Sequence, residues 1–182
     1  MPKPKMEEVE QRFGCPLIEL WGMTEIGGLG TTFAANGPVK HGSIGVALPY
    51  TDARIADTED ASKTMPVGEV GELMIKGGTV MQGYYGNEQA TQDTIRADGW
   101  LHTGDLASMD DDGCVFIVDR KKDMILTAGF NVYPAEIERV VAGHPDVALV
   151  AVGSIPDEDK GELAKAYICL LYTSDAADEE DS

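Results

Sequence analysis

Apolar and polar positions alternate over short distances between Ser43 and Asp119. Short apolar runs there are separated by Gly, Pro and Asp, which is the pattern of strands joined by turns. The pattern therefore predicts a β-rich domain in this part of the chain. Its expected elements are strands at Ala53–Ala56, Glu72–Lys76 and Val115–Val118, and a small helix near Asn87–Ile95.

The pattern changes after Arg120, where a helical stripe precedes two continuous apolar runs. Pro134 suits the first turn of a helix, because the N–H that proline lacks would have no intrahelical partner there. Ile137, Val140 and Val141 are spaced to form the buried side of that helix. The apolar runs Val147–Val152 and Ala166–Leu171 are predicted strands, so this part is expected to be the start of a small α+β domain.

The N-terminal segment is predicted to contain a helix and a strand that lead into a loop. The spacing of apolar residues within Glu7–Phe13 favours a short helix, which Gly14 ends. Leu17–Leu20 is expected to be a strand that enters the loop Trp21–Gly30.

The whole chain is therefore expected to have an α+β fold in two parts. Residues 1–119 form the β-rich part, and residues 120–171 form the start of the small domain, with a boundary near Asp119–Lys122. Residues 172–182 form an acidic tail without apolar periodicity. This tail is predicted to be disordered or foreign to the fold.

Net charge excludes one large class of function. Fourteen Lys and Arg against 32 Asp and Glu give a formal net charge of −18. A field of that sign repels nucleic-acid backbones unless a local basic patch overcomes it. The densest basic run, Arg120-Lys121-Lys122, lies between two aspartates and suits one small anion better than a nucleic acid.

Composition also bears on the compartment. No segment approaches the roughly 18 apolar residues that a membrane span needs, and the basic N-terminus lacks the apolar core of a secretory signal. Cys15, Cys114 and Cys169 have no metal-ligand spacing and are expected to stay reduced. A cytoplasmic protein without a membrane span is therefore predicted, while peripheral membrane contact and the oligomeric state stay open.

Several glycine-rich motifs occur in a fixed order. Glycine accounts for 21 of 182 residues and is clustered between apolar runs. The motifs are Trp21–Glu25 (WGMTE), Gly71–Gly77 with Gly83–Tyr85, Trp100–Asp105 (WLHTGD), and Asp119–Asp123 (DRKKD) through Gly129 to Pro134–Glu138. In this order the chain, from about residue 7 to 170, resembles the adenylate-forming (AMP-binding) superfamily and, within it, the fatty acyl-CoA synthetases.

The resemblance implies a reaction in two steps. A medium- or long-chain fatty acid attacks the α-phosphate of ATP, and coenzyme A then displaces AMP from the acyl-adenylate. The first step gathers negative charge on phosphate oxygens, which calls for Mg²⁺ and fixed donors. ATP, Mg²⁺ and coenzyme A are therefore the expected cofactor and co-substrates, and residues 1–119 would be the C-terminal portion of the large AMP-binding domain.

Two residues of the first motif would act directly on these groups. By resemblance, Glu25 holds Mg²⁺, and the Thr24 hydroxyl donates to the phosphate or the acyl carboxylate. A hard carboxylate oxygen is a ligand that Mg²⁺ prefers. The alternative interpretation is that Thr24 and Glu25 only begin a helix.

The nucleotide would be bound by residues from three motifs. Trp21, together with Gly22 and Met23, occupies the place where the family has an aromatic ring beside adenine; a buried core tryptophan is the alternative. Asp105 matches the aspartate that accepts hydrogen bonds from both ribose hydroxyls, since two carboxylate oxygens suit a vicinal diol. A turn aspartate is its alternative. Arg120 resembles a second ribose contact, with a surface ion pair as its alternative.

Two further residues follow from the same resemblance. Lys122 matches the family's hinge, where the small mobile domain rotates between the two steps, and hinges are a few boundary residues that absorb large dihedral changes. Gly129 lies on the loop expected to approach coenzyme A, with an ordinary turn glycine as its alternative. His102 lies within a motif but is assigned no catalytic role.

Two parts of the family's site are not found in the sequence. These are the glycine-rich phosphate loop far before Trp21–Glu25 and the lysine that contacts the substrate carboxylate near the family's C-terminus. The chain is therefore expected to be a fragment of an acyl-CoA synthetase and to be inactive alone. A non-catalytic nucleotide-binding or interaction module, or an adenylate-forming ligase for another carboxylate, are the alternatives. The presence of Thr24, Glu25, Asp105 and Arg120 favours the enzyme.

Overall fold

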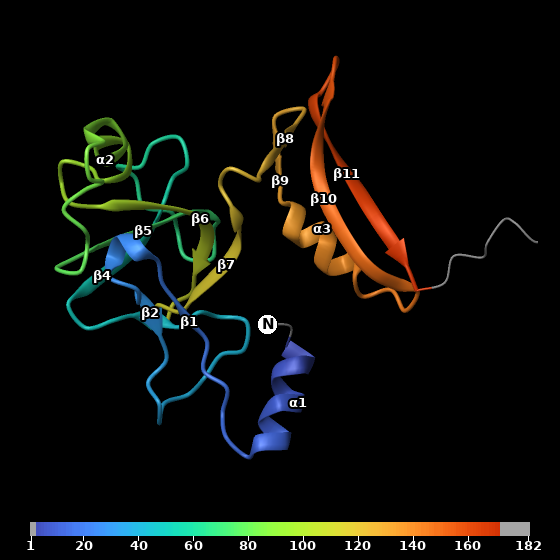
Figure 1. The fold of residues 1–182 in the computed structure, drawn as a ribbon, viewed down its shortest axis with the longest axis horizontal. Coiled ribbons are helices and arrows are strands. Elements are labelled where there is room, and N and C mark those ends of the chain that lie inside the picture. Colours follow the sequence, from blue (N-terminus) through green and yellow to red (C-terminus); the bar gives the residue numbers. More distant parts are fainter. Residues whose placement is uncertain (1–2, 172–182) are drawn as a thin grey trace, which may run out of the picture. The chain divides into compact units, whose positions relative to one another are not determined.

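The computed structural model describes residues 3–171 and divides the chain into two compact units between Lys121 and Lys122 (Figure 1). Each unit is described by itself. The acidic tail, residues 172–182, lies outside the described residues. The elements of the first unit are α1 (Lys3–Phe13), β1 (Leu20–Trp21), the 3-10 helix η1 (Thr24–Ile26), β2 (Thr31–Thr32), β3 (Val46–Ala47), β4 (Thr51–Ala56), β5 (Gly71–Gly77), α2 (Glu88–Thr94), β6 (Leu101–Met109) and β7 (Val115–Arg120).

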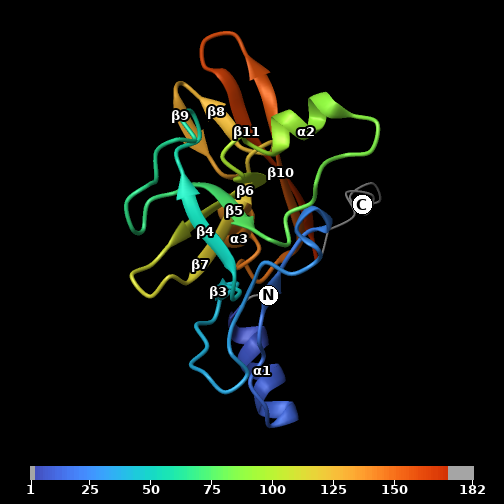
Figure 2. The same cartoon turned by 90° about the vertical axis from the view of Figure 1, so that its left-hand side faces the viewer.

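The strands described in the first unit form two antiparallel sheets. The larger has the order β4-β5-β6-β7, so each strand pairs with its neighbour in sequence, and the smaller has the order β1-β2-β3. Figure 2 shows β4, β5, β6 and β7 side by side. The segment Ser43–Gly45 is hydrogen-bonded to Val115 at the start of β7, through both backbone groups and the Ser43 hydroxyl. These bonds connect the loop before β3 to the larger sheet.

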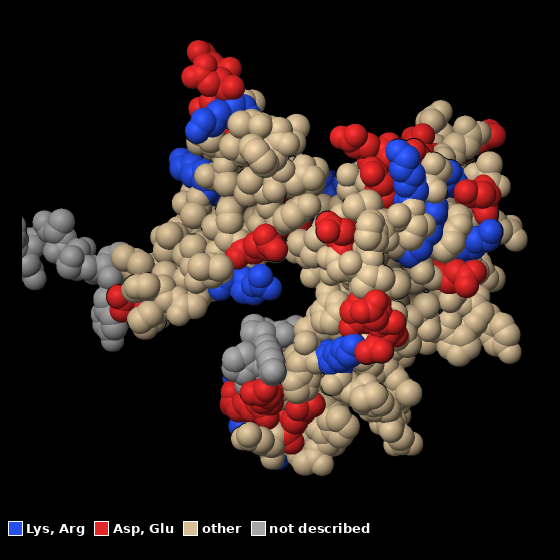
Figure 3. All heavy atoms as spheres, turned by 180° about the vertical axis from the view of Figure 1, so that it is seen from behind, with Lys and Arg blue, Asp and Glu red and all other residues tan. Residues whose placement is uncertain are grey.

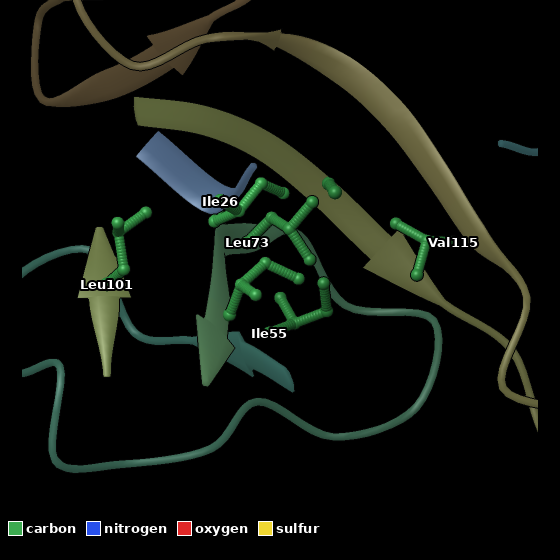
Figure 4. Close-up of a cluster of buried hydrophobic side chains, with 7 residues drawn as sticks. Ile26, Ile55, Leu73, Leu101 and Val115 are labelled. Carbon is green, nitrogen blue, oxygen red and sulfur yellow. The ribbon is translucent and has the colours of Figure 1, made fainter. Parts of the chain in front are cut away.

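The core of the first unit lies against the larger sheet. Figure 4 shows the side chains of Ile26, Ile55 and Leu73 grouped between Leu101 and Val115. All five are at most 3% exposed, and Ile26 comes from η1 and not from the sheet. Burial of a large aliphatic side chain contributes about 1.5–3 kcal/mol relative to exposure. The core therefore fixes η1, which carries Thr24 and Glu25, against the sheet that carries Asp105.

The second unit is an antiparallel sheet with one helix. Its elements are β8 (Ile125–Thr127), β9 (Phe130–Val132), α3 (Pro134–Val141), β10 (Val147–Asp157) and β11 (Gly161–Leu170), with the strand order β10-β11-β8-β9. The side chain of Glu138 on α3 accepts a hydrogen bond from the Val152 N–H of β10 at 2.8 Å, which ties the helix to the sheet.

Most of the elements expected from the sequence are present. The helices near Asn87–Ile95 and from Pro134 are confirmed, and Asn87 is the N-cap whose side chain accepts from the Ala90 N–H. The strand expected at Leu17–Leu20 is wrong except at its end, because β1 begins only at Leu20. Leu17 instead donates its N–H to the Glu10 carboxylate of α1 at 2.8 Å.

β2, β3, β6, β8 and β9 were not among the expected elements, and one residue expected to be buried is exposed. β6, a central strand of the larger sheet, contains the Trp100–Asp105 motif, whose mixed polarity hid its strand character. Val140, expected on the buried side of its helix, is 75% exposed, whereas Ile137 and Val141 are half-buried. Ile137, Val140 and Val141 have the i, i+3, i+4 spacing of one side of a helix, and Val140 is the exposed member of that stripe.

The surface agrees with the acidic composition. On the face drawn in Figure 3, Asp and Glu side chains lie at several separate places, and Lys and Arg side chains lie next to many of them. In the first unit, Lys40 is bound to Asp110 at 2.5 Å and to Asp112 at 2.6 Å. Among the described residues, no helix is long and apolar enough to cross a bilayer.

Candidate functional site

Asp105 is the centre of a group of residues that are distant in the sequence. Asp105 lies on β6, and the residue is 5% exposed. The Trp21 indole N–H donates to Oδ2 at 2.8 Å, and the Arg120 Nε lies 2.8 Å from Oδ1. The structure thus brings together three residues that the sequence predicted for one nucleotide site.

An irregularity in the sheet positions Asp105. Glu72 on β5 pairs with Leu106 and Met74 pairs with His102, so the intervening segment of β6 has more residues than the segment of β5 opposite it. Gly104 has a φ of +74° there, a conformation that favours glycine. The Thr103 hydroxyl secures the bulge, because it donates to the Leu73 carbonyl at 2.7 Å and accepts from the Asp105 N–H at 3.1 Å. Bulges of this kind redirect side chains next to active sites.

The Asp105 carboxylate has acceptor capacity beyond its present partners. A carboxylate has about four lone-pair positions on its two oxygens. Trp21 uses one position on Oδ2, and Arg120 uses one on Oδ1. One further hydrogen bond to each oxygen matches two adjacent hydroxyls, so the arrangement can bind a vicinal diol such as a ribose.

Trp21 has contacts that fit both interpretations made from the sequence. Its ring lies so close to Gly30 that a Cβ there would come within 2.7 Å of Cζ3, and it packs beside the core of the first unit. Its indole N–H nevertheless points to Asp105. Trp21 is therefore partly a core residue and partly a hydrogen-bond donor to the candidate site.

The next two residues of the motif shape the loop. Gly22 lies against the backbone of Gly28, and a Cβ at Gly22 would come within 1.8 Å of the Gly28 carbonyl oxygen. Met23 is half-buried, packs against the core, and accepts backbone hydrogen bonds from Ile26 and Gly28. Only glycine fits at position 22, while Met23 holds the loop through both its carbonyl and its packed side chain.

Glu25 is held in place by residues that follow β5. Its side chain is half-buried, and its Oε1 accepts a hydrogen bond from the Tyr84 hydroxyl at 2.9 Å. Its carbonyl accepts from the Met81 N–H at 2.8 Å. The hydrogen bond to Glu25 raises the pKa of Tyr84, because it stabilises the protonated phenol. Thr24, the preceding residue, is exposed.

Glu25 fits the role of a single carboxylate ligand to Mg²⁺. Within residues 3–171, no group of three or more His, Cys, Asp or Glu side chains could hold a metal ion by itself. Mg²⁺ commonly uses one or two carboxylates together with phosphates and waters, so it does not need such a group. The hydrogen bond to Oε1 is compatible with a metal ion on Oε2, and it fixes the carboxylate as outer partners of metal ligands do.

A buried ionic cluster next to Asp105 was missed at the sequence level. Glu72 on β5 is 2% exposed, with the Lys121 Nζ at 2.8 Å and the His102 Nδ1 at 3.0 Å. Burial alone would raise the pKa of Glu72, but the hydrogen bonds from Lys121 and His102 outweigh it and hold the pKa below its usual value. A charged residue within the otherwise apolar strand Gly71–Ile75 was the signal that could have identified it.

The structure places Lys122 and Gly129 in the second unit. Lys122 is exposed in a turn and is the first residue after the division between the units. Gly129 and Ala128 form the two-residue turn between β8 and β9, with φ values of +84° and +50°. Positive φ at both positions is the geometry of a tight hairpin turn, which by itself accounts for a glycine at 129.

Comparison with protein families gives two successive matches. Residues 1–85 match the model of the AMP-binding enzyme family, and residues 136–181 match the model of the AMP-binding enzyme C-terminal domain. Among curated relatives, the long-chain-fatty-acid–CoA ligase of Escherichia coli O6:H1 is 44% identical over 169 residues, which cover 91% of this chain and 30% of that protein. The 4-coumarate–CoA ligase-like 4 of Oryza sativa subsp. japonica is 41% identical over 165 residues, covering 90% and 30%.

Solved structures resemble the chain over most of its length. ATP-bound MatB from Rhodopseudomonas palustris superposes with a TM-score of 0.84 at 37% identity, covering 91% of this chain and 32% of that protein. MenE, the o-succinylbenzoate CoA synthetase of Bacillus subtilis, in complex with the acyl-adenylate OSB-AMP, gives 0.83 at 35% identity, covering 94% and 35%. The chain thus spans about a third of the length of each of these four relatives.

Proposed function

The chain belongs to the AMP-binding enzyme family, and we propose that the full-length protein containing it is an ATP-dependent fatty acid–CoA ligase. The observation that carries this proposal is the Asp105 carboxylate, buried and held by Trp21 and Arg120 with acceptor positions left for a diol. The long-chain-fatty-acid–CoA ligases that match at 44–47% identity support the substrate class.

The proposed reaction has two displacements. In the first, a fatty acid carboxylate oxygen bonds to the α-phosphorus of ATP, and the bond from that phosphorus to pyrophosphate breaks. In the second, the thiolate of coenzyme A bonds to the acyl carbonyl carbon, and the bond from that carbon to AMP breaks. The nucleotide stays in place through both steps, so a fixed ribose contact serves both.

Asp105, Arg120 and Trp21 would bind the nucleoside. Asp105 would accept a hydrogen bond from each ribose hydroxyl, and Arg120 would contact the ribose while it orients the Asp105 carboxylate. Trp21 would lie beside adenine and orient Asp105 through its indole N–H. Gly22 and Met23 would hold the loop that presents Trp21, because Gly22 allows the close approach of Gly28.

Glu25 and Thr24 would act on the phosphates. Mg²⁺, when bound, neutralises negative charge that develops on phosphate oxygens. Glu25 would be its protein ligand, fixed by Tyr84, and the Thr24 hydroxyl would donate to the phosphate or the acyl carboxylate. MenE was solved with ATP and a magnesium ion, and at 34% identity it is a relative in which this use of the metal can be compared.

The two units would have separate roles in the full-length protein. Residues 1–119 would be the end of the large AMP-binding domain, and residues 120–171 the start of a small mobile domain. Lys122 would be the hinge, which its exposed turn after the division at Lys121 supports. Gly129, in the exposed turn between β8 and β9, would approach coenzyme A.

ATP–pyrophosphate exchange by the full-length protein tests the proposal. The panel should contain medium- and long-chain fatty acids, a hydroxycinnamic acid and amino acids. We expect exchange with the fatty acids. Exchange with amino acids alone would contradict the fatty-acid assignment, and a protein that binds nucleotide without any exchange would be a non-catalytic module.

The rice relative favours one second candidate. The 4-coumarate–CoA ligase-like protein is 41% identical, close to the identity of the bacterial fatty-acid ligases. An aromatic acid is therefore the alternative carboxylate, and exchange that is faster with the hydroxycinnamic acid than with any fatty acid would select it.

A further inference from the structure

Glu72 is a buried carboxylate to which the proposed reaction assigns no role. Its side chain is 2% exposed, and its neighbours on β5, Leu73, Met74 and Ile75, are fully buried apolar residues. Burying a carboxylate costs free energy unless it is paired and hydrogen-bonded. An apolar residue at this position would pack without that cost, so packing alone does not account for a glutamate here.

The partners of Glu72 are specific atoms on the two neighbouring segments. Its Oε2 lies 2.8 Å from the Lys121 Nζ and 3.0 Å from the His102 Nδ1, and its Oε1 accepts from the Gly104 N–H at 3.3 Å. Because an ionised carboxylate only accepts, the His102 Nδ1 must carry the proton that it donates. Both carboxylate oxygens therefore have partners.

These partners flank the ribose-binding pair. Gly104 directly precedes Asp105, and Lys121 directly follows Arg120. Asp105 and Arg120 are paired in register across β6 and β7, and the Lys121 N–H donates to the Gly104 carbonyl at 2.8 Å. A single carboxylate thus binds the residue next to each member of the pair.

The position of Gly104 in the bulge makes this contact consequential. A bulge leaves a backbone group outside the regular ladder, and an unpaired N–H can adopt several orientations. The Glu72 Oε1 gives the Gly104 N–H a partner, while Oε2 draws Lys121 toward the same point. The backbone before Asp105 and the backbone after Arg120 are thereby tied to one fixed charge on β5.

We propose that Glu72 is a positioning residue for ribose binding, which holds Asp105 and Arg120 in the geometry that accepts both hydroxyls. This inference rests on the proposed function, because it takes Asp105 and Arg120 as the ribose contacts. Glu72 itself does not touch the nucleotide. Its loss leaves Asp105 and Arg120 present but no longer held in one arrangement.

The test is discrimination between AMP and 2′-deoxy-AMP, measured by calorimetry on the full-length protein. The deoxy nucleotide lacks one of the hydroxyls that Asp105 accepts. We expect the wild type to bind AMP about tenfold more tightly, the effect of one buried hydrogen bond to a charged group. In Glu72→Gln the preference should fall to about twofold or less, because Asp105 is no longer held to accept from both hydroxyls.

Three further variants make the result specific. Asp110→Asn removes another carboxylate that pairs with a lysine in the same unit, and it should keep the wild-type preference. Lys121→Met removes the partner of Glu72 from a half-exposed position, so it should fold and should lose part of the preference. Glu72→Gln added to Asp105→Ala should cause no further loss, because Glu72 acts through Asp105.

The outcomes separate this inference from the proposed reaction. Equal weakening of both nucleotides by a folded Glu72→Gln protein, with the preference unchanged, would show a purely structural role and overturn the inference. If Glu72→Gln does not fold, an unchanged preference in Lys121→Met overturns it in the same way. A wild type without preference also overturns it. The wild type could prefer AMP but form no acyl-CoA, while Glu72→Gln loses that preference. This result would support the positioning role of Glu72 and contradict the proposed reaction.

Discussion

Two side chains hold Asp105 in place. Trp21 lies 84 residues before it in the sequence, and Arg120 lies opposite it on the adjacent strand β7. Trp21 and Arg120 each bind a different oxygen, so the carboxylate is fixed in two directions. Because the carboxylate is already fixed, less conformational freedom is lost when a nucleotide binds. A buried, fixed acceptor can therefore contribute more free energy to binding than an exposed, mobile one.

Removing the Asp105 carboxylate should weaken use of ATP by the full-length protein. In Asp105→Ala the ribose hydroxyls lose their acceptor and Trp21 loses its partner, at a cost of about 1–3 kcal/mol. We expect kcat/KM for ATP to fall by the corresponding factor, with KM for the fatty acid little changed. Asp52→Ala, which removes an exposed carboxylate of β4, is the control and should behave as the wild type.

Trp21 should act through its indole N–H as well as its ring. Trp21→Phe keeps an aromatic ring and removes the hydrogen bond to Asp105. We expect a smaller loss of ATP affinity than in Asp105→Ala, together with a weaker preference for AMP over 2′-deoxy-AMP. An unchanged preference would show that only the ring of Trp21 matters.

The sequence identified the residues of the site better than their partners. Asp105, Arg120 and Glu25 could be named because each lies in a motif. Tyr84, the partner of Glu25, lies in a quoted motif but its role was missed, since 59 residues separate it from Glu25 and only folding joins them. The Glu72 cluster was missed for the same reason.

At the scale of elements, the bulge in β6 was the feature hardest to foresee. Strand signals depend on alternation, and the segment Leu101–Asp105 mixes buried Leu101, Thr103 and Asp105 with a glycine of positive φ. Strands with simple alternation or continuous apolar character, such as β5 and β10, were recognised, although β10 extends to Asp157. The strand pattern is therefore irregular where the candidate site lies.

The connection from β7 to β8 should control only the second step of the reaction. Lys122→Pro restricts its own φ and the conformation of Lys121, so it should limit rotation at the proposed hinge. We expect ATP–pyrophosphate exchange to be kept and thioester formation to fall. Lys122→Ala, which leaves the backbone free, should keep both activities, and an equal fall of both activities in Lys122→Pro would contradict the hinge assignment.

The ionic cluster of Glu72, His102 and Lys121 should give stability a defined pH dependence. The pKa of Glu72 is lower in the folded protein than its usual value, because Lys121 and His102 donate to it. Its contribution is therefore present above the usual glutamate range and is lost as pH falls through the lowered folded value. The difference in unfolding free energy between the wild type and Glu72→Gln should shrink as the solution is acidified through that window. A difference that is constant with pH would contradict the assignment.

At the scale of the whole molecule, the hairpin of β10 and β11 keeps large apolar side chains exposed in the second unit. Leu149 is 72% exposed and Tyr167 is 54% exposed, and their register places both on one face. Exposed apolar surface of this kind marks an interaction site or a tendency to aggregate. Both strands were predicted from their continuous apolar runs, Val147–Val152 and Ala166–Leu171.

The 182-residue chain expressed alone should therefore bind hydrophobic dyes or aggregate, and it should form no acyl-CoA. Leu149→Lys combined with Tyr167→Lys should reduce dye binding. Glu88→Lys combined with Gln92→Lys, both on the exposed helix α2, changes the charge elsewhere and should not. A monomeric 182-residue chain that makes acyl-CoA would contradict the interpretation of the chain as a part of the enzyme.

The most direct test of the central claim is product analysis with the full-length protein. The protein is incubated with ATP, Mg²⁺, coenzyme A and a long-chain fatty acid, and the products are identified by mass spectrometry. Our account predicts fatty acyl-CoA with one AMP and one pyrophosphate for each thioester, and a marked fall in all three in Asp105→Ala. Release of ADP and phosphate in place of AMP and pyrophosphate, or thioester formation that is unchanged in Asp105→Ala, would contradict it.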